Sequence, residues 1–177
     1  PGRLGGRALA VRGPFSWTGD VAAFSKATVA IDANEGGGAI SLNTGGTKPL
    51  ITGTLAFDDF NMAAYLGLRQ PGGSDLTRFL EGSYMREWLQ RLGAVWTLPL
   101  AHQVDADFRL SAKKIQWDAS KIGPAAMTVA LKNGKLSAHL AEVLFDGGAG
   151  SGQIAIDFNG LVPQWTLRGR LKSAPAG

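Results

Sequence analysis

Hydrophobic and polar residues alternate along most of this chain, and a two-residue period is that of a β-strand with one apolar and one polar face. The clearest case runs from Val104 to Lys113. Its apolar parity holds Val104, Ala106, Phe108, Leu110 and Ala112, and its polar parity holds Asp105, Asp107, Arg109, Ser111 and Lys113. The same pattern predicts strands over residues 4–12, 26–32, 39–43, 50–57, 114–117, 125–132, 135–140, 143–145, 152–158 and 164–172.

Turn-forming residues separate these strands. The run DANEGGG, residues 32–38, is rich in residues that tolerate positive φ, and it predicts a hairpin between strands 26–32 and 39–43. Asn133-Gly134 is a type I′ hairpin signal between two further strands. The second half of the chain is therefore predicted to be an antiparallel meander.

The period changes between residues 58 and 96. Apolar residues there recur at spacings of three and four, which is typical of an amphipathic helix. Ser74 or Asp75 is a suitable N-cap, and Gly82 weakens the middle of the segment by about 1 kcal/mol relative to alanine. The apolar set is Leu76, Phe79, Leu80, Tyr84, Trp88, Leu89 and Leu92.

One sequence motif occurs twice in the chain. The dodecamer GAISLNTGGTKP begins at Gly38 and GQIAIDFNGLVP begins at Gly152, an offset of 114 residues. Upstream, ATVAI around Thr28 is matched by MTVAL around Thr128, so the second copy is expected to carry one additional hairpin before its glycine. Repeats that differ by whole hairpins indicate related β-units.

The predicted fold is mainly β: an antiparallel, repeat-like sheet, either curved into an open groove or closed over a packed core, with one short amphipathic helical segment. The first β-unit spans 26–57, the helical segment 58–96 and the second β-unit 104–172, all within a single β-rich chain, 1–177. We expect this chain to be a fragment of a larger protein. It begins at Pro1 without a signal peptide and ends in SAPAG without a structural stop.

Composition narrows the class of protein. With 177 residues, 45% hydrophobic and 18% charged, the chain is long enough and apolar enough to fold as a globular unit. It has no cysteine, which excludes disulfides and thiolate metal sites. The net charge of +4 comes from dispersed lysines and arginines, so no nucleic-acid partner is expected.

Candidate chemistry is sparse. His102, Asp105 and Asp107 are close in sequence, but only the two aspartates share a strand face, so no metal site is expected. Asp58-Asp59 is predicted to be a turn, and the serine of GAGSGQ leads into a strand rather than a helix, unlike a nucleophile elbow. We therefore expect no enzyme activity, no catalytic residues and no cofactor.

Four stretches of the chain resemble the carboxy-terminal region of the AsmA-like proteins of Gram-negative bacteria. A strand with Asp-Ala-Asp at residues 104–107 leads to an Asn/Asp-Gly-x-Leu hairpin at 133–136. A Gly-Gly step at 147–148 and a Gly-x-Ile-x-Ile-Asp strand at 152–157 follow. The family's amino-terminal membrane anchor is absent from the sequence, and the helical segment has no match in this pattern.

The resemblance implies a non-enzymatic periplasmic protein, anchored in the inner membrane, that takes part in outer-membrane biogenesis and, in larger relatives, in phospholipid transport along a hydrophobic groove. The expected partners are phospholipid or another envelope lipid and the remaining repeats of the parent chain. The lipid-facing candidates are Val104, Phe108, Leu110, Val129, Leu131, Ile154 and Ile156. The candidates for contact with lipid headgroups are Lys113, Lys114, Arg168 and Arg170.

A second class of function stays open at this point. Five tryptophans are present, and an exposed set of indoles is typical of a carbohydrate- or envelope-binding β-module. The residues available for such a surface are Trp17, Trp96 and Trp117. An enzyme ranks third, because no acid, base and nucleophile converge in the sequence.

Overall fold

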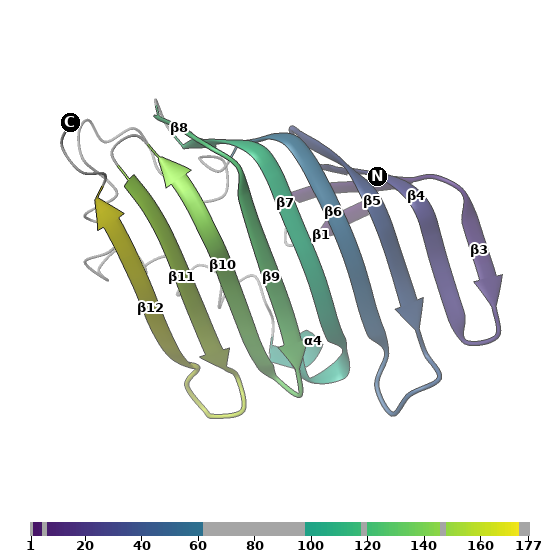
Figure 1. Ribbon diagram of the computed structural model, residues 1–177. Coiled ribbons are helices and arrows are strands. Elements are labelled where there is room, and N and C mark those ends of the chain that lie inside the picture. Colours follow the sequence, from purple (N-terminus) through teal and green to yellow (C-terminus); the bar gives the residue numbers. More distant parts are fainter. Residues whose placement is uncertain (1, 5–6, 62–97, 118–119, 146–147, 174–177) are drawn as a thin grey trace.

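The computed structural model describes residues 2–4, 7–61, 98–117, 120–145 and 148–173, and they form one open, mostly antiparallel β-sheet with very little helix (Figure 1). The first half contributes β1 (Gly2–Leu4), β2 (Arg7–Arg12), β3 (Phe15–Thr18), β4 (Val21–Ile31), β5 (Asn34–Asn43) and β6 (Leu50–Asn61). The second half contributes α4 (Leu98–Gln103), β7 (Asp105–Trp117), β8 (Ser120–Ile122), β9 (Ala125–Lys132), β10 (Lys135–Phe145), β11 (Gly148–Asp157) and β12 (Gln164–Ser173). The predicted fold class is confirmed.

Strand order follows the chain almost throughout. The sheet runs β1-β2-β4-β5-β6-β7-β9-β10-β11-β12, with β3 paired to β4 and β8 paired to β7 beside this path. Every pair is antiparallel except β6 and β7, which run parallel. A parallel pair needs a crossover connection, and here α4 is the last part of that connection before β7.

The predicted helical segment begins too early. Residues 58–61 belong to β6, and Phe60 and Asn61 pair with Ile115 and Gln116 of β7. The strand continues because Phe60 packs its ring against Phe57, with ring centroids 5.1 Å apart. The helical pattern over residues 76–92 lies outside the described residues.

The internal repeat is longer and more regular than the sequence suggested. The first unit consists of strands β3 to β6, and the second unit consists of strands β9 to β12. Equivalent residues of the two units are 114 positions apart throughout. β3 and β9 end at Thr18 and Lys132, β4 and β10 begin at Val21 and Lys135, β5 and β11 span Asn34–Asn43 and Gly148–Asp157, and β6 and β12 begin at Leu50 and Gln164. No hairpin is inserted in either unit, and β7 lies between them.

The loops that close the two units repeat in atomic detail. The backbone N–H of Gly45 donates to Oδ1 of Asn43 at 2.9 Å, and that of Asn159 donates to Oδ1 of Asp157 at 2.9 Å. These are Asx turns at equivalent positions. The preceding tight turns match as well, with φ of 56° at Gly19 and 51° at Asn133.

This register corrects one predicted correspondence. Thr128 lies in β9, whose counterpart is β3, whereas Thr28 lies in β4. The shared Thr-Val-Ala triplets are therefore not equivalent. Small and β-branched residues are common in strands, and a match of three of them arises without common position.

The predicted turn at residues 32–38 is also too long. Only Asp32, with φ of 53°, and Ala33 form the turn, and β5 already begins at Asn34. Gly36 stays in the strand because the ring of Phe57 lies over it, and a Cβ on Gly36 would meet that ring at 2.6 Å. The glycines here serve close packing between strands rather than a loop.

Two β-bulges keep the apolar residues on one side of the sheet. In β4 two residues, Ser25 and Lys26, lie opposite Ala39 alone, and in β10 the residues 141–142 lie opposite Ser151 alone. The insertion of one residue returns Ala27 to the face of Phe24 although they are three positions apart. The bulge of the second unit comes two residue pairs later than that of the first.

Strand register aligns the apolar residues in rows across the sheet. The inner row crosses nine strands through Phe15, Phe24, Ile40, Gly53, Phe108, Val129, Ala138, Ile154 and Leu167. The outer row, nearer the closing loops, crosses the same strands through Trp17, Ala22, Leu42, Ile51, Ala106, Leu131, Leu136, Ile156 and Trp165. Paired residues point to the same side of a sheet, so these rows define its apolar face.

Two elements pack against the ends of the apolar face. Leu9 and Val11 of β2 contact the cluster around Val29 and Phe57, and Figure 1 shows the purple amino-terminal strands behind β5 and β6. At the other end Ala101 of α4 is buried in a second cluster, together with Leu131, Ile156 and Phe158. A third cluster joins Ile115, Ala125 and Val143. The described core therefore consists of separate patches along one side of the sheet.

Candidate functional site

The apolar face extends across nine strands of the described sheet. Six of the seven lipid-facing candidates lie in β7, β9 and β11 and share this face through their register: Phe108, Leu110, Val129, Leu131, Ile154 and Ile156. The seventh, Val104, precedes β7 and packs against the cluster that includes Ala101. The structure thus brings the predicted residues together on one side.

Burial varies along this face. In the outer row, Leu131 and Ile156 are buried where α4 covers them. In the inner row, Phe108, Val129 and Ile154 are only half-buried. The middle of the face is therefore partly open to solvent, whereas its ends are covered by α4 and β2.

An aromatic ring fills the place of a missing side chain in the inner row. Gly53 is paired with Phe108 across the parallel strands, and a Cβ on Gly53 would meet the ring of Phe108 at 2.5 Å. The ring therefore lies over the glycine and continues the apolar surface between β6 and β7. Phe57 does the same over Gly36. The result is an apolar surface without a polar side chain in the inner row.

Large exposed hydrophobic residues gather at one end of the sheet. The turn β3–β4 and the loops β5–β6 and β11–β12 all lie at this end, at the bottom of Figure 1. The exposed residues in or next to these connections are Trp17, Val21, Leu42, Leu50, Leu161, Val162 and Trp165. The apolar face therefore reaches an apolar rim. Alternation along the sequence does not indicate Leu161 and Val162, because both are in a loop.

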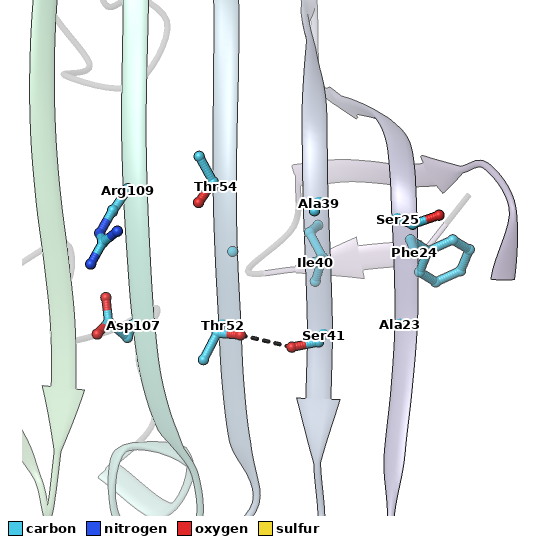
Figure 2. A pocket seen from close by; sticks show the side chains of 11 residues that line it. Ala23, Phe24, Ser25, Ala39, Ile40, Ser41, Thr52, Thr54, Asp107 and Arg109 are labelled. Carbon is cyan, nitrogen blue, oxygen red and sulfur yellow. Dashed lines mark hydrogen bonds between the residues drawn. The ribbon is translucent and has the colours of Figure 1, made fainter. Parts of the chain in front are cut away.

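The opposite side of the sheet, the polar face, carries short polar side chains. A shallow depression of about 360 Å³ lies on this face, over β4 to β7. Figure 2 shows the side chains that line it. The hydroxyls of Ser41 and Thr52 are 2.7 Å apart on its floor, and Asp107, Arg109 and Thr54 flank them. Short residues explain the hollow, because they leave the backbone of β5 and β6 uncovered.

The residues considered for metal binding do not assemble. Oδ1 of Asp105 accepts a hydrogen bond from the backbone N–H of Asn133 at 2.9 Å, which holds the β9–β10 turn against β7. Asp107 lines the depression of the polar face, and His102 lies on α4 beside Gly134. Within the described ranges, no group of three or more His, Asp or Glu side chains is placed to hold a metal ion.

The Asp58-Asp59 pair lies in β6, so the predicted turn there is wrong. Asp58 forms an exposed ion pair with Lys113 of β7, with 2.7 Å between Oδ1 and Nζ. The hydrogen bond from Lys113 lowers the pKa of Asp58, and the same bond raises the pKa of Lys113. Exposed pairs of this kind contribute little to stability, and this one links the two parallel strands.

The headgroup candidates do not gather beside the apolar face. Lys113 is paired with Asp58, and Lys114 is exposed next to it. Arg168 and Arg170 are exposed on β12, where they pair across strands with Gln153 and Ser151 of the polar face. Three of the four cations therefore point away from the surface that they were expected to border.

The tryptophans are spread over the sheet. Trp17 is 70% exposed, and its Nε1 donates a hydrogen bond to the carbonyl of Gly19 at 2.8 Å. Trp165, 38% exposed, lies at the opposite end of the outer row. Trp96 and the side chain of Trp117 lie outside the described residues. The two described exposed indoles are thus separated by seven intervening strands.

Comparisons with protein-family models, curated proteins and solved structures found no match to this chain. Among the helices that the structure describes, none is long and apolar enough to cross a membrane.

Proposed function

We propose that this chain is a non-enzymatic segment whose apolar face contacts the acyl chains of phospholipids. The observation that carries the proposal is the inner row, which continues across nine strands and is half-buried from Phe24 to Leu167. Eight spacings of about 4.8 Å make the row about 38 Å long, and an acyl chain in one leaflet extends about 15 Å, half of the hydrocarbon core. The row has the length to carry lipid tails from strand to strand.

The size of the face also supports a ligand. Side chains on one face repeat about every 6.6 Å along a strand, so the two rows together span a band of about 38 by 13 Å, or roughly 500 Å². α4 covers the part of this band around Leu131 and Ile156. Soluble monomers rarely expose more than a few hundred Å² of contiguous apolar surface. Sheets normally bury such a face under a second layer, and the described part of this chain supplies only α4 and β2 for that purpose.

The resemblance to the AsmA-like proteins agrees with this use of the sheet. On that basis we propose that the chain acts in the periplasm of a Gram-negative bacterium, in a parent protein anchored in the inner membrane, as part of a path for phospholipids toward the outer membrane. Its partners would be the lipid and further repeats of the parent chain. The role of the protein is to exclude water from the acyl chains, which requires no catalytic group.

Photo-crosslinking tests the proposal in cells. A photoreactive amino acid at Phe108 or Ile154 is expected to capture phospholipid, because both residues lie in the inner row. The matched controls are the adjacent positions Asp107 and Ala155 on the polar face, which should give no lipid adduct. Equal labelling on both faces, or no labelling of Phe108 and Ile154, would refute acyl-chain contact.

A further inference from the structure

The internal repeat makes one prediction about the edge of the sheet. In the first unit, the outer side of β6 is occupied by β7, which runs parallel to it. In the second unit, the equivalent strand β12 is the last strand of the sheet, and no strand of the described residues pairs with its outer side. Figure 1 shows β12 at the left edge of the described sheet. Among the described strands, β6 is therefore paired on its outer side and β12 is not.

The paired edge shows how a neighbouring strand fits. On the apolar face of β6 and β7, a large residue faces a small one in three pairs: Ile51 with Ala106, Gly53 with Phe108, and Phe57 with Ala112. The fourth pair on this face, Leu55 with Leu110, joins two large residues. The complementarity of the second pair places the ring of Phe108 over Gly53. Cross-strand pairs of this kind stabilise a sheet and fix its register.

The apolar face of β12 also combines large residues with a glycine, but the glycine is at a different position than in β6. On the apolar face β12 presents Trp165, Leu167 and then Gly169. Gly169 has room above it, since a Cβ there would meet only the carbonyl oxygen of Ser151, at 3.7 Å. The glycine that leaves room for an aromatic ring, the seat, is Gly53 in β6 and Gly169 in β12. Gly169 lies two residues beyond Leu167, which is the equivalent of Gly53. On the polar face, Arg168 and Arg170 flank this seat.

We infer that the outer edge of β12 binds an extended polypeptide strand that runs parallel to it. The strand has a small residue opposite Trp165, an aromatic residue opposite Gly169 and acidic residues opposite Arg168 and Arg170. Backbone hydrogen bonds along the ten residues of β12 hold it, as they hold β7 on β6. The inference is independent of lipid binding, because it rests on the repeat and on the register of β6 and β7.

Two labelled nonapeptides test the inference by fluorescence anisotropy with the folded chain. The first has the sequence Asp-Ala-Asp-Leu-Glu-Phe-Glu-Ala-Lys, which in the register of β7 places Phe opposite Gly169 and Glu opposite both arginines. The second is the natural sequence of residues 105–113, which places Leu opposite Gly169 and Arg opposite Arg168. The first is expected to bind about tenfold more tightly, because three cross-strand pairs favour it.

Two further measurements separate edge pairing from general adhesion. Gly169→Val fills the seat without a backbone clash and should weaken the first peptide about tenfold, whereas Ala155→Val, on the polar face of β11, should leave binding unchanged. Two N-methylated versions of the first peptide are compared, one methylated at the odd positions and one at the even positions. Alternate N–H groups of a strand point toward and away from its partner, so one version should lose binding and the other should keep it. Equal affinity of the two peptides, no binding, or indifference to Gly169→Val would overturn the inference. A dimer of this chain that Gly169→Val dissociates would overturn it too, in favour of a second copy.

Discussion

The first and second units have the same strands and the same turns, yet they differ in how closely their strands approach. Gly38 in β5 and Gly152 in β11 are equivalent residues at the offset of 114. A Cβ on Gly38 would overlap the carbonyl oxygen of Thr54, whereas a Cβ on Gly152 would lie 3.5 Å from the equivalent carbonyl oxygen, that of Arg168. The backbones of β5 and β6 in the first unit therefore approach more closely than those of β11 and β12 in the second.

Sequence differences between the units are consistent with this contrast. The first unit has three consecutive glycines at residues 36–38, and the second has Ser151 between Gly150 and Gly152. Glycine allows the backbones of β5 and β6 to coil closely, and Phe57 packs over Gly36 as a result. The tight unit contains the buried cluster around Val29 and Phe57, and the looser unit contains β12, the last strand of the described sheet. The two units thus share a backbone fold but make different contacts, the first in a buried cluster and the second at the edge of the described sheet.

The largest expected effect comes from the equivalent glycines. Gly38→Ala should destabilise the fold by about 3 kcal/mol, because the new methyl group meets backbone that cannot rotate away. Gly152→Ala should be neutral or stabilise by about 0.5 kcal/mol, since it fits and restricts the unfolded chain. The measurement is the urea midpoint of unfolding for each variant. Equal losses at both positions would contradict the difference between the units.

A smaller difference is expected for the buried valines Val29 and Val143, which are also equivalent. Val29 is 1% exposed within the larger cluster and Val143 is 9% exposed within a smaller one. Val29→Ala removes about two methylene equivalents and leaves a cavity, at a cost of about 2 kcal/mol, and Val143→Ala should cost about 1 kcal/mol. Thermal and urea unfolding measure both. A larger loss for Val143→Ala would show that the second unit holds the main core.

The smallest effect concerns acid stability and the two Asx turns. The first turn uses Asn43, which does not titrate, and the second uses Asp157. Hydrogen bonds from the backbone N–H of Asn159, then from Lys135 and the Asn159 side chain, lower the pKa of Asp157. Its carboxylate therefore stabilises the fold above the unfolded pKa of about 3.9, and this contribution is lost as the pH falls through the folded pKa.

Asp157→Asn gives the second turn the side chain of the first. The variant should lose less stability than the natural chain between about pH 5 and pH 3, because the substituted amide does not titrate. Unfolding midpoints across this range measure the difference, and Asn43→Ala is the control that should leave the shape of the pH profile unchanged. Identical profiles for Asp157→Asn and the natural chain would show that this carboxylate does not couple folding to protonation.

Much of this fold could be predicted from local patterns. Alternation located the strands because one face of the sheet is apolar and the other polar, and Asn133-Gly134 marked its hairpin because that turn requires positive φ. The offset between Gly38 and Gly152 identified two units. These features depend on residues close together in the sequence.

Other features depend on contacts that local patterns do not contain. The parallel pairing of β6 with β7 joins residues 55 positions apart. The short strand β3 has exposed residues without clear alternation. Gly36 to Gly38 resembled a turn because the aromatic ring that packs over Gly36 comes from β6. For the candidate site, the alternation of apolar and polar residues predicted which strand residues share the apolar face. It did not indicate Leu161 and Val162, because these exposed residues are in a loop.

The most direct test of an acyl-binding face is the phospholipid content of the purified protein. Lipid extracted from the natural chain and quantified by mass spectrometry should be stoichiometric, and it should fall severalfold in Val129→Asn, which places an amide in the inner row. The adjacent Thr128→Asn, on the polar face, should retain the natural amount, with circular dichroism confirming that both variants fold. Absence of phospholipid from the natural chain, or equal amounts in both variants, would contradict the account.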